Sequence, residues 1–411
     1  MRKIAVFSLS LFLIAVLFKT NGMTQTPRPS WWEFQSIDTM KYSRDTAREK
    51  NNDREFAKTI DEQIKAIGQT GATHVAIATP YDDEFLPFLT LWVNTARKYG
   101  LNIWFRGNWS GWEQWFGYGK INREEHLIKT AEFINKNAGL FRDGDVFTAC
   151  PECENGGPGD PRFNNDANGH RLFLIKEYEL TKGLFNKLNK KVKSNYLSMN
   201  GDVARLIMDE ETTSKLDGLV VIDHYVSSPE ILANDIKNIA VKSKAKIVLG
   251  EFGTPIPDIH GKMTDEEQSK WIKEALEKLS AIPEVIGLNY WVSYGGSTEI
   301  WRPDNSEKAA VSVLSSFFKP QVLNGKIVNE LDWPVENAMV ETRGRKETTD
   351  AQGMFSLPFI GENSQVEISH KDYEKIQLTV SEFKNNQSAV LIKTSESFVY
   401  KLLKKIKELI D

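Results

Sequence analysis

The sequence predicts a (β/α)8 barrel followed by a small antiparallel β-sandwich. Between Trp31 and about Lys319, short apolar runs alternate with longer amphipathic runs, which is typical of successive β-α units. After Pro320 the pattern changes to short strands separated by polar turns, which is typical of a sandwich. Many of the earlier apolar runs also end in a polar residue, as expected where the strand ends of a barrel surround one cavity. The expected domains are the barrel at 31–319, the sandwich at 320–395 and a C-terminal helix at 396–411.

Composition places the chain among ordinary globular proteins. Of its 411 residues, 40% are hydrophobic and 26% are charged, which is enough apolar material for two folded domains. The formal net charge of -4 provides no general attraction to nucleic acid, so we expect no nucleic-acid partner. There are 11 tryptophans, and several fall in expected loops. Because exposed indole rings are costly, these loops suggest a flat apolar partner such as the face of a sugar.

The first 22 residues have the pattern of a secretory signal. Arg2 and Lys3 precede an apolar run from Ile4 to Phe18, and these 15 residues are short for a helix that crosses a bilayer. No clean cleavage site with small residues follows, so an uncleaved N-terminal anchor is the alternative. We therefore expect a secreted or extracytoplasmic protein that is either free or held by this segment.

Eight apolar runs are candidate strands of the barrel. They occupy residues 31–37, 73–80, 101–107, 145–150, 191–199, 218–225, 246–252 and 285–292. Helix-like stretches lie between them, for example at 53–70 and 264–282, and the series closes at 306–318. Thr264 and Glu267 form the sequence signature of a capping box at the start of one such helix. A doubly wound open sheet is the alternative, but the glycine-rich phosphate turn of that fold is missing at the expected place.

Polar residues at the ends of the candidate strands are the candidate site. They are Asp38, Tyr81, Asp82, Arg106, Asn108, Glu152, Glu154, Asn200, His224, Tyr225, Glu251 and Trp291. Glu251 ends the apolar run KIVLGEF, and Glu152 and Glu154 follow the run DVFTAC. A carboxylate at the mouth of a buried strand is costly unless it has a task. Two such carboxylates in one barrel are what cleavage of a glycosidic bond requires, one as nucleophile and one as acid.

The motif VLGEFGTP resembles the end of strand seven in clan A of the glycoside hydrolases, which includes family-five cellulases and mannanases. The resemblance implies that Glu251 is the nucleophile, and LNYWVSYGG similarly gives Trp291 the role of sugar platform. The clan carries its acid/base glutamate after strand four, preceded by asparagine, whereas this chain has PECEN there. Counting from Val146 favours Glu154 over Glu152 as the acid/base. Such an enzyme needs no cofactor.

The remaining strand-end residues are expected to bind substrate or to orient the nucleophile. Tyr225 and Arg106 are candidates to hold Glu251, and Asn155 or Asn108 could replace the missing asparagine. Tyr81, Asn200 and His224 are further substrate-binding candidates, although a histidine such as His224 is more often structural. Trp109, in the loop GNWSGWEQWFG, is either a sugar platform or part of the core.

Two further features carry less specific predictions. Cys150 and Cys153 are the only cysteines, and their C-x-x-C spacing lacks the second pair or histidine of a zinc site. We expect buried thiols or a local disulfide, and no metal. Oxygen ligands at Asp160 and Asp166 could hold calcium, but their spacing matches no EF-hand loop.

The region after the barrel contains GKIVNE, PVENAMVET and TTDAQGMFSLP in this order, and it resembles the carboxypeptidase regulatory-like (transthyretin-like) module. The final segment SFVYKLLKKIKELID is basic and amphipathic. It either packs its apolar face on its own domain or makes a peripheral contact with an anionic membrane.

Together these patterns predict a secreted retaining glycoside hydrolase that cleaves β-linked polysaccharides or oligosaccharides with two glutamates. The alternative is a non-catalytic carbohydrate-binding or cell-surface protein on a decayed barrel, for which the unusual PECEN motif is the main argument.

Overall fold

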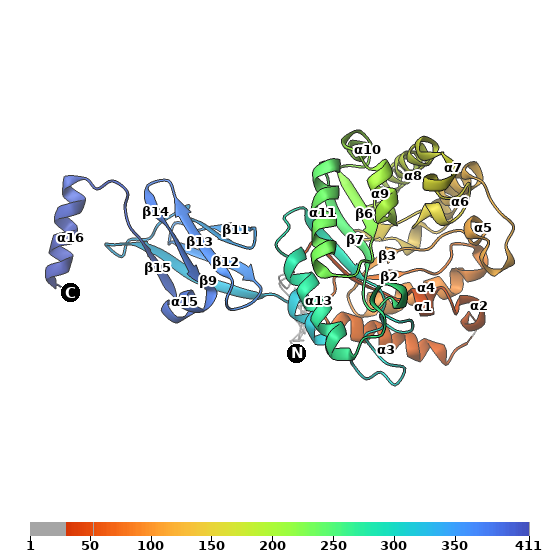
Figure 1. Ribbon diagram of the computed structural model, residues 1–411, viewed down its shortest axis with the longest axis horizontal. Helices are drawn as coiled ribbons and strands as arrows, with labels where there is room; N and C mark the ends of the chain where they lie inside the picture. The colour runs from red at the N-terminus through yellow and green to blue at the C-terminus, as the bar shows by residue number, and fades with distance from the viewer. Residues whose placement is uncertain (1–29, 52, 411) are drawn as a thin grey trace, which may run out of the picture.

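The structure is a computed structural model that describes residues 30–51 and 53–410. The predicted signal or anchor at 1–22 lies outside the described residues. A barrel, a β-sandwich and a C-terminal helix follow one another along the long axis of the molecule (Figure 1).

Eight parallel strands form the predicted barrel. They are β1 (Phe34–Asp38), β2 (His74–Ile77), β3 (Asn102–Phe105), β4 (Val146–Phe147), β5 (Ser198–Asn200), β6 (Leu219–Asp223), β7 (Lys246–Phe252) and β8 (Val285–Tyr290). Their order is β4-β3-β2-β1-β8-β7-β6-β5, and a parallel bridge between Val146 and Lys193 joins the two ends. The predicted fold class is thereby confirmed.

Helices alternate with these strands and surround the sheet (Figure 1). The longer ones are α3 (Phe56–Gln69), α4 (Leu86–Lys98), α6 (Arg123–Lys136), α8 (Ala167–Lys187), α9 (Gly201–Ile207), α11 (Pro229–Ser243), α13 (Asp265–Leu279) and α14 (Ala309–Phe318). Short helices in the loops are α1 (Met40–Ser43), α2 (Ala47–Lys50), α5 (Ser110–Glu113), α7 (Pro161–Asn164), α10 (Glu210–Ser214) and α12 (Pro257–His260). The predicted capping box is present at α13, where the side chains of Thr264 and Glu267 each accept the backbone N–H of the other residue.

The interior of the barrel is apolar at one end and polar at the other. Phe34, Trp104 and Tyr196 pack against one another near the starts of the strands, with ring centroids 5.2–5.9 Å apart. This apolar plug fills the lower half of the barrel, as in other small closed barrels. Polar side chains from the carboxyl ends of the strands therefore converge above an apolar floor.

The sandwich consists of two sheets around a second hydrophobic core. One sheet has the order β11 (Arg345–Thr348), β10 (Met339–Thr342), β13 (Gln365–His370) and β14 (Tyr373–Thr379). The other has β12 (Met354–Phe359), β9 (Gln321–Asn329) and β15 (Ser388–Leu391), and α15 (Val380–Asn386) precedes β15. Pairing is antiparallel except that β15 runs parallel to β9. In the predicted T-D-x-x-G-x-F turn, Asp350 accepts the N–H groups of Gln352 and Met354, and Gly353 takes a φ of 75°.

The sandwich is attached to the barrel face that carries the starts of the strands. The turn between β10 and β11 places Arg343 and Gly344 at φ values of 45° and 77°, as in a tight two-residue hairpin turn. Arg343 donates to the Glu277 carbonyl at 3.1 Å, and the Arg345 guanidinium lies 5.2 Å from the ring centre of Trp31, just before β1. The polar ends of the strands are thus on the opposite face of the barrel.

The chain ends in α16 (Phe398–Ile410), at the end of the sandwich that is distant from the barrel (Figure 1). Among residues 30–51 and 53–410, no helix has both the length and the apolar character that crossing a bilayer requires.

Candidate active site

Arg106 is the centre of the polar end of the barrel. It follows β3, only 1% of its surface is exposed, and its guanidinium reaches carboxylates from three other strands. The contacts are 2.5 Å to Glu251, 2.6 Å to Asp223 and 3.4 Å to Asp38. The rigid five-donor fork of arginine suits such a shared ion pair in a buried place. One positive charge therefore holds together three acidic strand ends.

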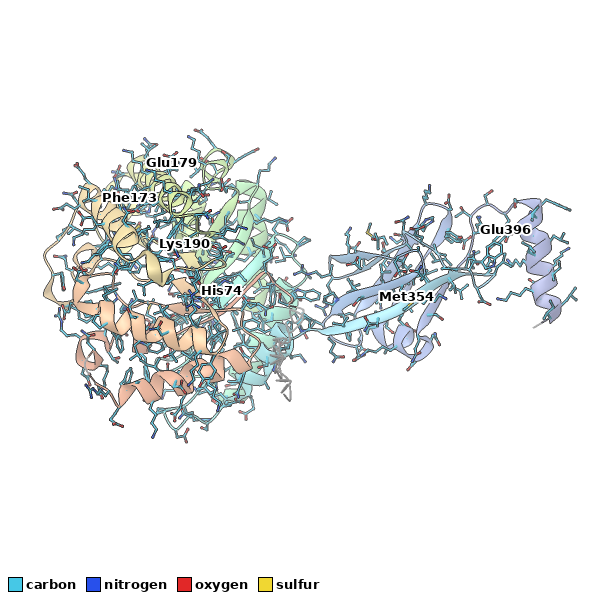
Figure 2. The ribbon with its side chains drawn as sticks, turned by 180° about the vertical axis from the view of Figure 1, so that it is seen from behind. His74, Phe173, Glu179, Lys190, Met354 and Glu396 are labelled. Atoms are coloured by element: carbon cyan, nitrogen blue, oxygen red, sulfur yellow. A yellow bond between two sulfur atoms is a disulfide. The ribbon has the colours of Figure 1, made fainter. Side chains whose placement is uncertain are left out.

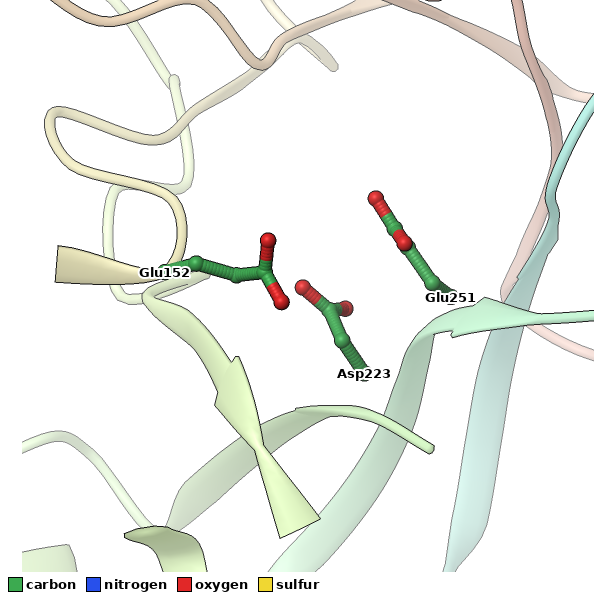
Figure 3. Close-up of side chains that lie close together, drawn as sticks. All are labelled: Glu152, Asp223 and Glu251. Atoms are coloured by element: carbon green, nitrogen blue, oxygen red, sulfur yellow. The ribbon is translucent and has the colours of Figure 1, made fainter. Parts of the chain in front are cut away.

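Three carboxylates meet beside Arg106. Glu152, Asp223 and Glu251 each offer an oxygen, and these oxygens all lie within 4.8 Å of one another (Figure 3). Asp223 and Glu251 are paired across β6 and β7 at an irregularity in the register of these strands. Such an irregularity redirects side chains at a strand end. Gly250 makes room for the pair, because a Cβ atom at this position would lie 2.3 Å from Asp223 Oδ1.

Glu152 reaches the cluster from a tight turn after β4. The strand ends at Phe147, and Glu152 takes a left-handed conformation with φ 43° and ψ 53° between the two cysteines. Cys150 and Cys153 form a disulfide that closes this turn, which is the predicted alternative to free thiols. Asn155 donates to Glu152 Oε2 at 3.1 Å. The carboxyl is thus held by a covalently closed turn rather than by the strand itself.

Burial and the neighbouring Glu251 raise the pKa of Glu152 to about 8. Burial also raises the pKa of Asp223 well above its ordinary value, and that of Asp38 to about 6, against the opposing effect of Arg106. These shifts follow from crowding several acids around one cation in a desolvated place. At neutral pH, Glu152 consequently keeps its proton.

Glu251 has a different environment, because two donors point at its carboxylate. Arg106 donates to Oε1 at 2.5 Å, and the Tyr225 hydroxyl donates to Oε2 at 2.7 Å. Donors on both oxygens stabilise negative charge there. The structure therefore brings Glu251 together with both residues predicted to hold it.

Solved structures with the same fold include glycoside hydrolases. A GH5_18 variant from Bifidobacterium longum subsp. longum, solved with Manβ1-4GlcNAc, is 12% identical and matches over 70% of this chain and 78% of that chain, with a TM-score of 0.53. A GH5_18 variant from Streptomyces cattleya with the same ligand is 11% identical over 74% of this chain and 84% of that chain, with a TM-score of 0.54. The Streptomyces cattleya protein with GlcNAc is 12% identical over 73% and 85%, also with a TM-score of 0.54. At these identities the likeness shows the fold.

No protein-family model matches the sequence. No curated protein matches it either. The resemblance of the C-terminal sandwich to the carboxypeptidase regulatory-like module stays a prediction.

Glu154, the preferred acid/base in the sequence prediction, lies beside the cluster rather than in it. It is 3% exposed, its Oε1 accepts the backbone N–H of Asn200 at 2.6 Å, and its Oε2 has no partner among the described residues. Burial raises its pKa to about 7, and the charges that affect it most belong to Asp160 and Arg162. The structure thus places Glu152, the alternative of the prediction, next to Glu251. The count from Val146 assumed a continuous strand, whereas the chain leaves the strand after Phe147 and turns.

Other predicted site residues border the cluster. Trp291 follows β8, its ring is edge-on to that of Tyr225 at 6.0 Å, and its buried indole Nε1 has no partner among the described residues. The peptide bond between Trp291 and Val292 is cis. His224 is turned away, since its Nε2 contacts Asp235 at 2.8 Å. Asn200 caps α9 and accepts from Arg162, and both of these hydrogen bonds are made by its side-chain oxygen.

Three predicted substrate-binding residues lie in the core instead of at the cluster. The Tyr81 hydroxyl donates to the Thr148 carbonyl at 2.7 Å, and its ring packs among buried aromatic residues. Trp109 is 5% exposed and donates to Thr130. Asn108 is fully buried and accepts from the N–H of Trp109. Of the two alternatives for Trp109, the structure shows core packing.

Four polar residues near the cluster were not predicted from the sequence. Asp223 is the last residue of β6, and its position at a strand end is the signal in the sequence that indicates it. Ser198 and Asn289 lie inside strands, where Ser198 accepts from Arg106 at 3.2 Å and Asn289 donates to Asp38 at 3.1 Å. Burial raises the pKa of Glu113, on α5, to about 7.

The cluster of Glu152, Asp223 and Glu251 is also the only group among the described residues with the geometry of a metal site. Arg106 already provides the positive charge at this place, and an acidic cluster alone does not define a metal site. We assign no metal to it. Acid/base and nucleophilic chemistry is what this arrangement of carboxyls can perform.

Proposed function

We propose that this protein is a retaining glycoside hydrolase in which Glu251 is the nucleophile and Glu152 is the acid/base. The observation that carries the proposal is the juxtaposition of the two carboxyls, whose oxygens approach within 4.8 Å in the mouth of the barrel. Retaining enzymes place their carboxyl groups about 5–5.5 Å apart, whereas inverting enzymes need roughly 6.5–9.5 Å to admit a water molecule. An approach of the nearest oxygens to within 4.8 Å is compatible with the retaining arrangement, in which one of the two carboxylates attacks the sugar directly.

In the first step, Glu251 attacks the anomeric carbon while the bond from this carbon to the leaving oxygen breaks. Glu152 gives its proton to that oxygen, so a glycosyl ester on Glu251 and a free sugar or aglycone result. In the second step, the ionised Glu152 takes a proton from water, whose oxygen bonds to the anomeric carbon and releases Glu251. One water molecule is consumed, and both carboxyls return to their starting states.

The electrostatics of the two glutamates suit these roles. Arg106 and Tyr225 donate to Glu251, which keeps its charge stable and its oxygens aimed. The raised pKa of Glu152, about 8, keeps a proton available at neutral pH. Once Glu251 is esterified, its negative charge is gone, and the pKa of Glu152 falls so that it can act as base.

The substrate class we propose is a β-linked oligosaccharide or polysaccharide. Trp291 provides a half-buried ring beside Tyr225, and such a ring can pack against the apolar face of a sugar. Two of the solved neighbours hold Manβ1-4GlcNAc, so β-mannosides belong in the first substrate panel. Asn155 and Asn200 remain predicted contacts at the rim.

We also propose that the protein works outside the cytoplasm. This rests on the signal-like sequence at 1–22 and on the disulfide between Cys150 and Cys153, since disulfides persist in oxidising compartments.

The decisive experiment compares Glu251→Gln, Glu152→Ala and Glu154→Gln on aryl β-glycosides and a glycan panel. Glu251→Gln should reduce turnover to background. Glu152→Ala should lose activity about 100- to 10,000-fold. Azide should restore the activity of Glu152→Ala on an activated aryl glycoside, because azide needs no general base. The product should be a glycosyl azide of retained configuration.

Glu154→Gln is the matched control, because the amide oxygen can still accept the N–H of Asn200. It should keep most of the activity. If azide restored the activity of Glu154→Ala and not that of Glu152→Ala, Glu154 would be the acid/base instead of Glu152. If NMR showed a product of inverted configuration, the double-displacement mechanism would be excluded. Glycan binding without any release of reducing ends would favour the alternative of a non-catalytic binding protein.

A further inference from the structure

The C-terminal helix α16 contacts its own domain with its polar side and turns its apolar side to solvent. Tyr400 faces the sandwich and is 5% exposed. The large apolar side chains on the other side are between 44% and 87% exposed. They are Phe398, Val399, Leu402, Ile406, Leu409 and Ile410. An ordinary surface helix has the opposite orientation, with its apolar stripe on the core.

Polar contacts fix this orientation. Lys404 forms an ion pair with Glu330, and Lys407 forms one with Asp332 at 2.6 Å. The ring of Tyr400 is edge-on to that of Trp333, with centroids 6.4 Å apart. The sequence-based alternative in which the apolar face packs on the sandwich is therefore wrong, because this face has no partner within the described residues.

The apolar side chains form one continuous face. At 3.6 residues per turn, they and the partly buried Leu403 cover roughly 140° of the helix circumference, and no charged residue interrupts them. Lys401 and Lys405 follow at one margin, and both are exposed. Lys407 lies at the other margin. Lysines in these positions can extend their ammonium groups toward phosphate while their stems stay on the apolar face.

We propose that α16 binds the surface of an anionic phospholipid bilayer, lying in the interface with its apolar face among the acyl chains. The helix has the required features: a wide apolar face, an excess of lysine at its margins and a length insufficient to span. The ion pairs with Glu330 and Asp332 hold it so that this face points away from the protein. Apolar burial and attraction to anionic headgroups therefore act on the same surface.

A second copy of the chain fits this face less well. A helix of 13 residues is about 20 Å long. One face of so short a helix offers less surface than a standard stable interface, which buries about 1,200–2,000 Å². A two-fold contact would also bring the lysine margins of the two copies near each other, where like charges repel. Charge complementarity favours the lipid surface.

The position of α16 in the molecule is compatible with such a contact. Glu396, just before the helix, lies at the far end of the sandwich from the barrel (Figure 2). Nothing among the described residues covers the exposed face, so a flat surface can approach it without displacing any element.

The test uses the full-length chain and vesicles of phosphatidylcholine with and without phosphatidylglycerol. We expect co-sedimentation with the anionic vesicles, weakening as salt is added. Leu402→Glu with Ile406→Glu should lower the partition coefficient by about tenfold or more. Lys401→Glu with Lys405→Glu should remove the preference for anionic lipid. Both pairs of positions are exposed, so folding is preserved, which circular dichroism verifies.

Val241→Glu is the control, because Val241 is an apolar residue on α11 of the barrel that is even more exposed than Leu402 and Ile406. It should leave vesicle binding unchanged, and all variants should hydrolyse a soluble substrate at the rate of the parent protein. Absence of vesicle binding, or binding that is insensitive to the Leu402 and Ile406 changes, would overturn the proposal. So would a dimer in light scattering that the same changes dissociate, since the face would then be a self-association surface.

Discussion

Arg106 opposes the effect of burial on the pKa values of the acids around it. Its guanidinium is buried and touches Asp38, Asp223 and Glu251, while Glu152 lies at the edge of the same cluster. Burial opposes Arg106 at these acids, and it raises the pKa of Glu152, of Asp38 and even of Asp223, which Arg106 contacts at 2.6 Å. Glu251 differs from Glu152 because both Arg106 and Tyr225 donate hydrogen bonds to its carboxylate.

The pH dependence of hydrolysis should report the proton on Glu152. Because burial and Glu251 raise the pKa of Glu152 to about 8, the general acid is present below this pH and is lost above it. We expect kcat/KM to fall by about tenfold per pH unit on the alkaline side. The measurement is a pH–rate profile on a substrate with a poor leaving group.

Glu152→Gln should remove this alkaline limb from the residual activity, whereas Glu154→Gln should keep it. An alkaline limb that is unchanged in Glu152→Gln would assign the titration to another group. An aryl glycoside whose leaving group needs no proton provides a second check, since its first step should be insensitive to pH in this range.

The turn after β4 is the element on which the site depends most. The other strand ends deliver their side chains directly, but Glu152 stands in a turn that the Cys150–Cys153 disulfide closes. The left-handed backbone at Glu152 is uncommon for a residue other than glycine. The disulfide between Cys150 and Cys153 restricts the backbone conformations that the turn around Glu152 can adopt.

Cys150→Ala with Cys153→Ala should therefore affect catalysis more than folding. Loss of a closure of about four residues costs about 2 kcal/mol of stability on the chain-entropy estimate. We expect kcat to fall by about tenfold or more, because Glu152 is no longer held toward Glu251. Denaturant titration and steady-state kinetics measure the two effects.

The parent protein treated with a reductant should behave like this double variant, and reoxidation should restore it. A variant with normal kcat would show that the turn is held by packing alone, for example by the Asn155 contact to Glu152.

Most elements of the fold were predictable because their signals are local. The α13 capping box and the strand at Lys246–Phe252 follow directly from adjacent residues. The run at 191–199 was expected to be one strand, but only a bridge at Lys193 and the short β5 (Ser198–Asn200) pair with neighbours. The position of Glu152 was not predictable in this way, because it depends on where β4 stops and on a disulfide.

In the site, too, some features were predictable from local sequence, whereas others depend on tertiary packing. Glu251, Arg106 and Tyr225 were predicted together, since each follows a recognisable strand and the barrel brings strand ends to one place. Tyr81 and Trp109 also follow strands, yet their side chains turn into the aromatic core. Strand position gives the end of the barrel on which a residue lies, whereas tertiary packing decides the direction of its side chain.

At the scale of the whole molecule, the hairpin of β10 and β11 provides polar contacts between the two domains. The turn at Arg343 and Gly344 lies against the barrel, where Arg343 donates to the Glu277 carbonyl and Ser280 hydroxyl, and Arg345 stacks over Trp31. Ile360, in the segment after β12, adds an apolar contact, because it belongs to the hydrophobic core cluster of the barrel.

Arg343→Ala with Arg345→Ala should loosen the domains without unfolding either. We expect a broader distance distribution in small-angle scattering and a loss of about 1–3 kcal/mol in the unfolding free energy. Lys346→Ala, in the same hairpin but paired with Glu341 within the sandwich, is the control and should change neither. Activity on a small soluble substrate should stay constant in both variants. An unchanged scattering profile in the double variant would mean that other contacts hold the domains.

Attachment of the sandwich to the barrel floor also determines the direction in which the barrel opens relative to α16. The floor, the sandwich and α16 follow in one line, so the carboxyl cluster opens at the end opposite to the helix. In a molecule bound to a surface by α16, the sandwich would separate the barrel from that surface, and the open end of the barrel would point away from it. Glycans on the same surface would then be out of reach. Free glycans in the surrounding medium, or glycans on an opposing surface, could reach the open end of the barrel directly.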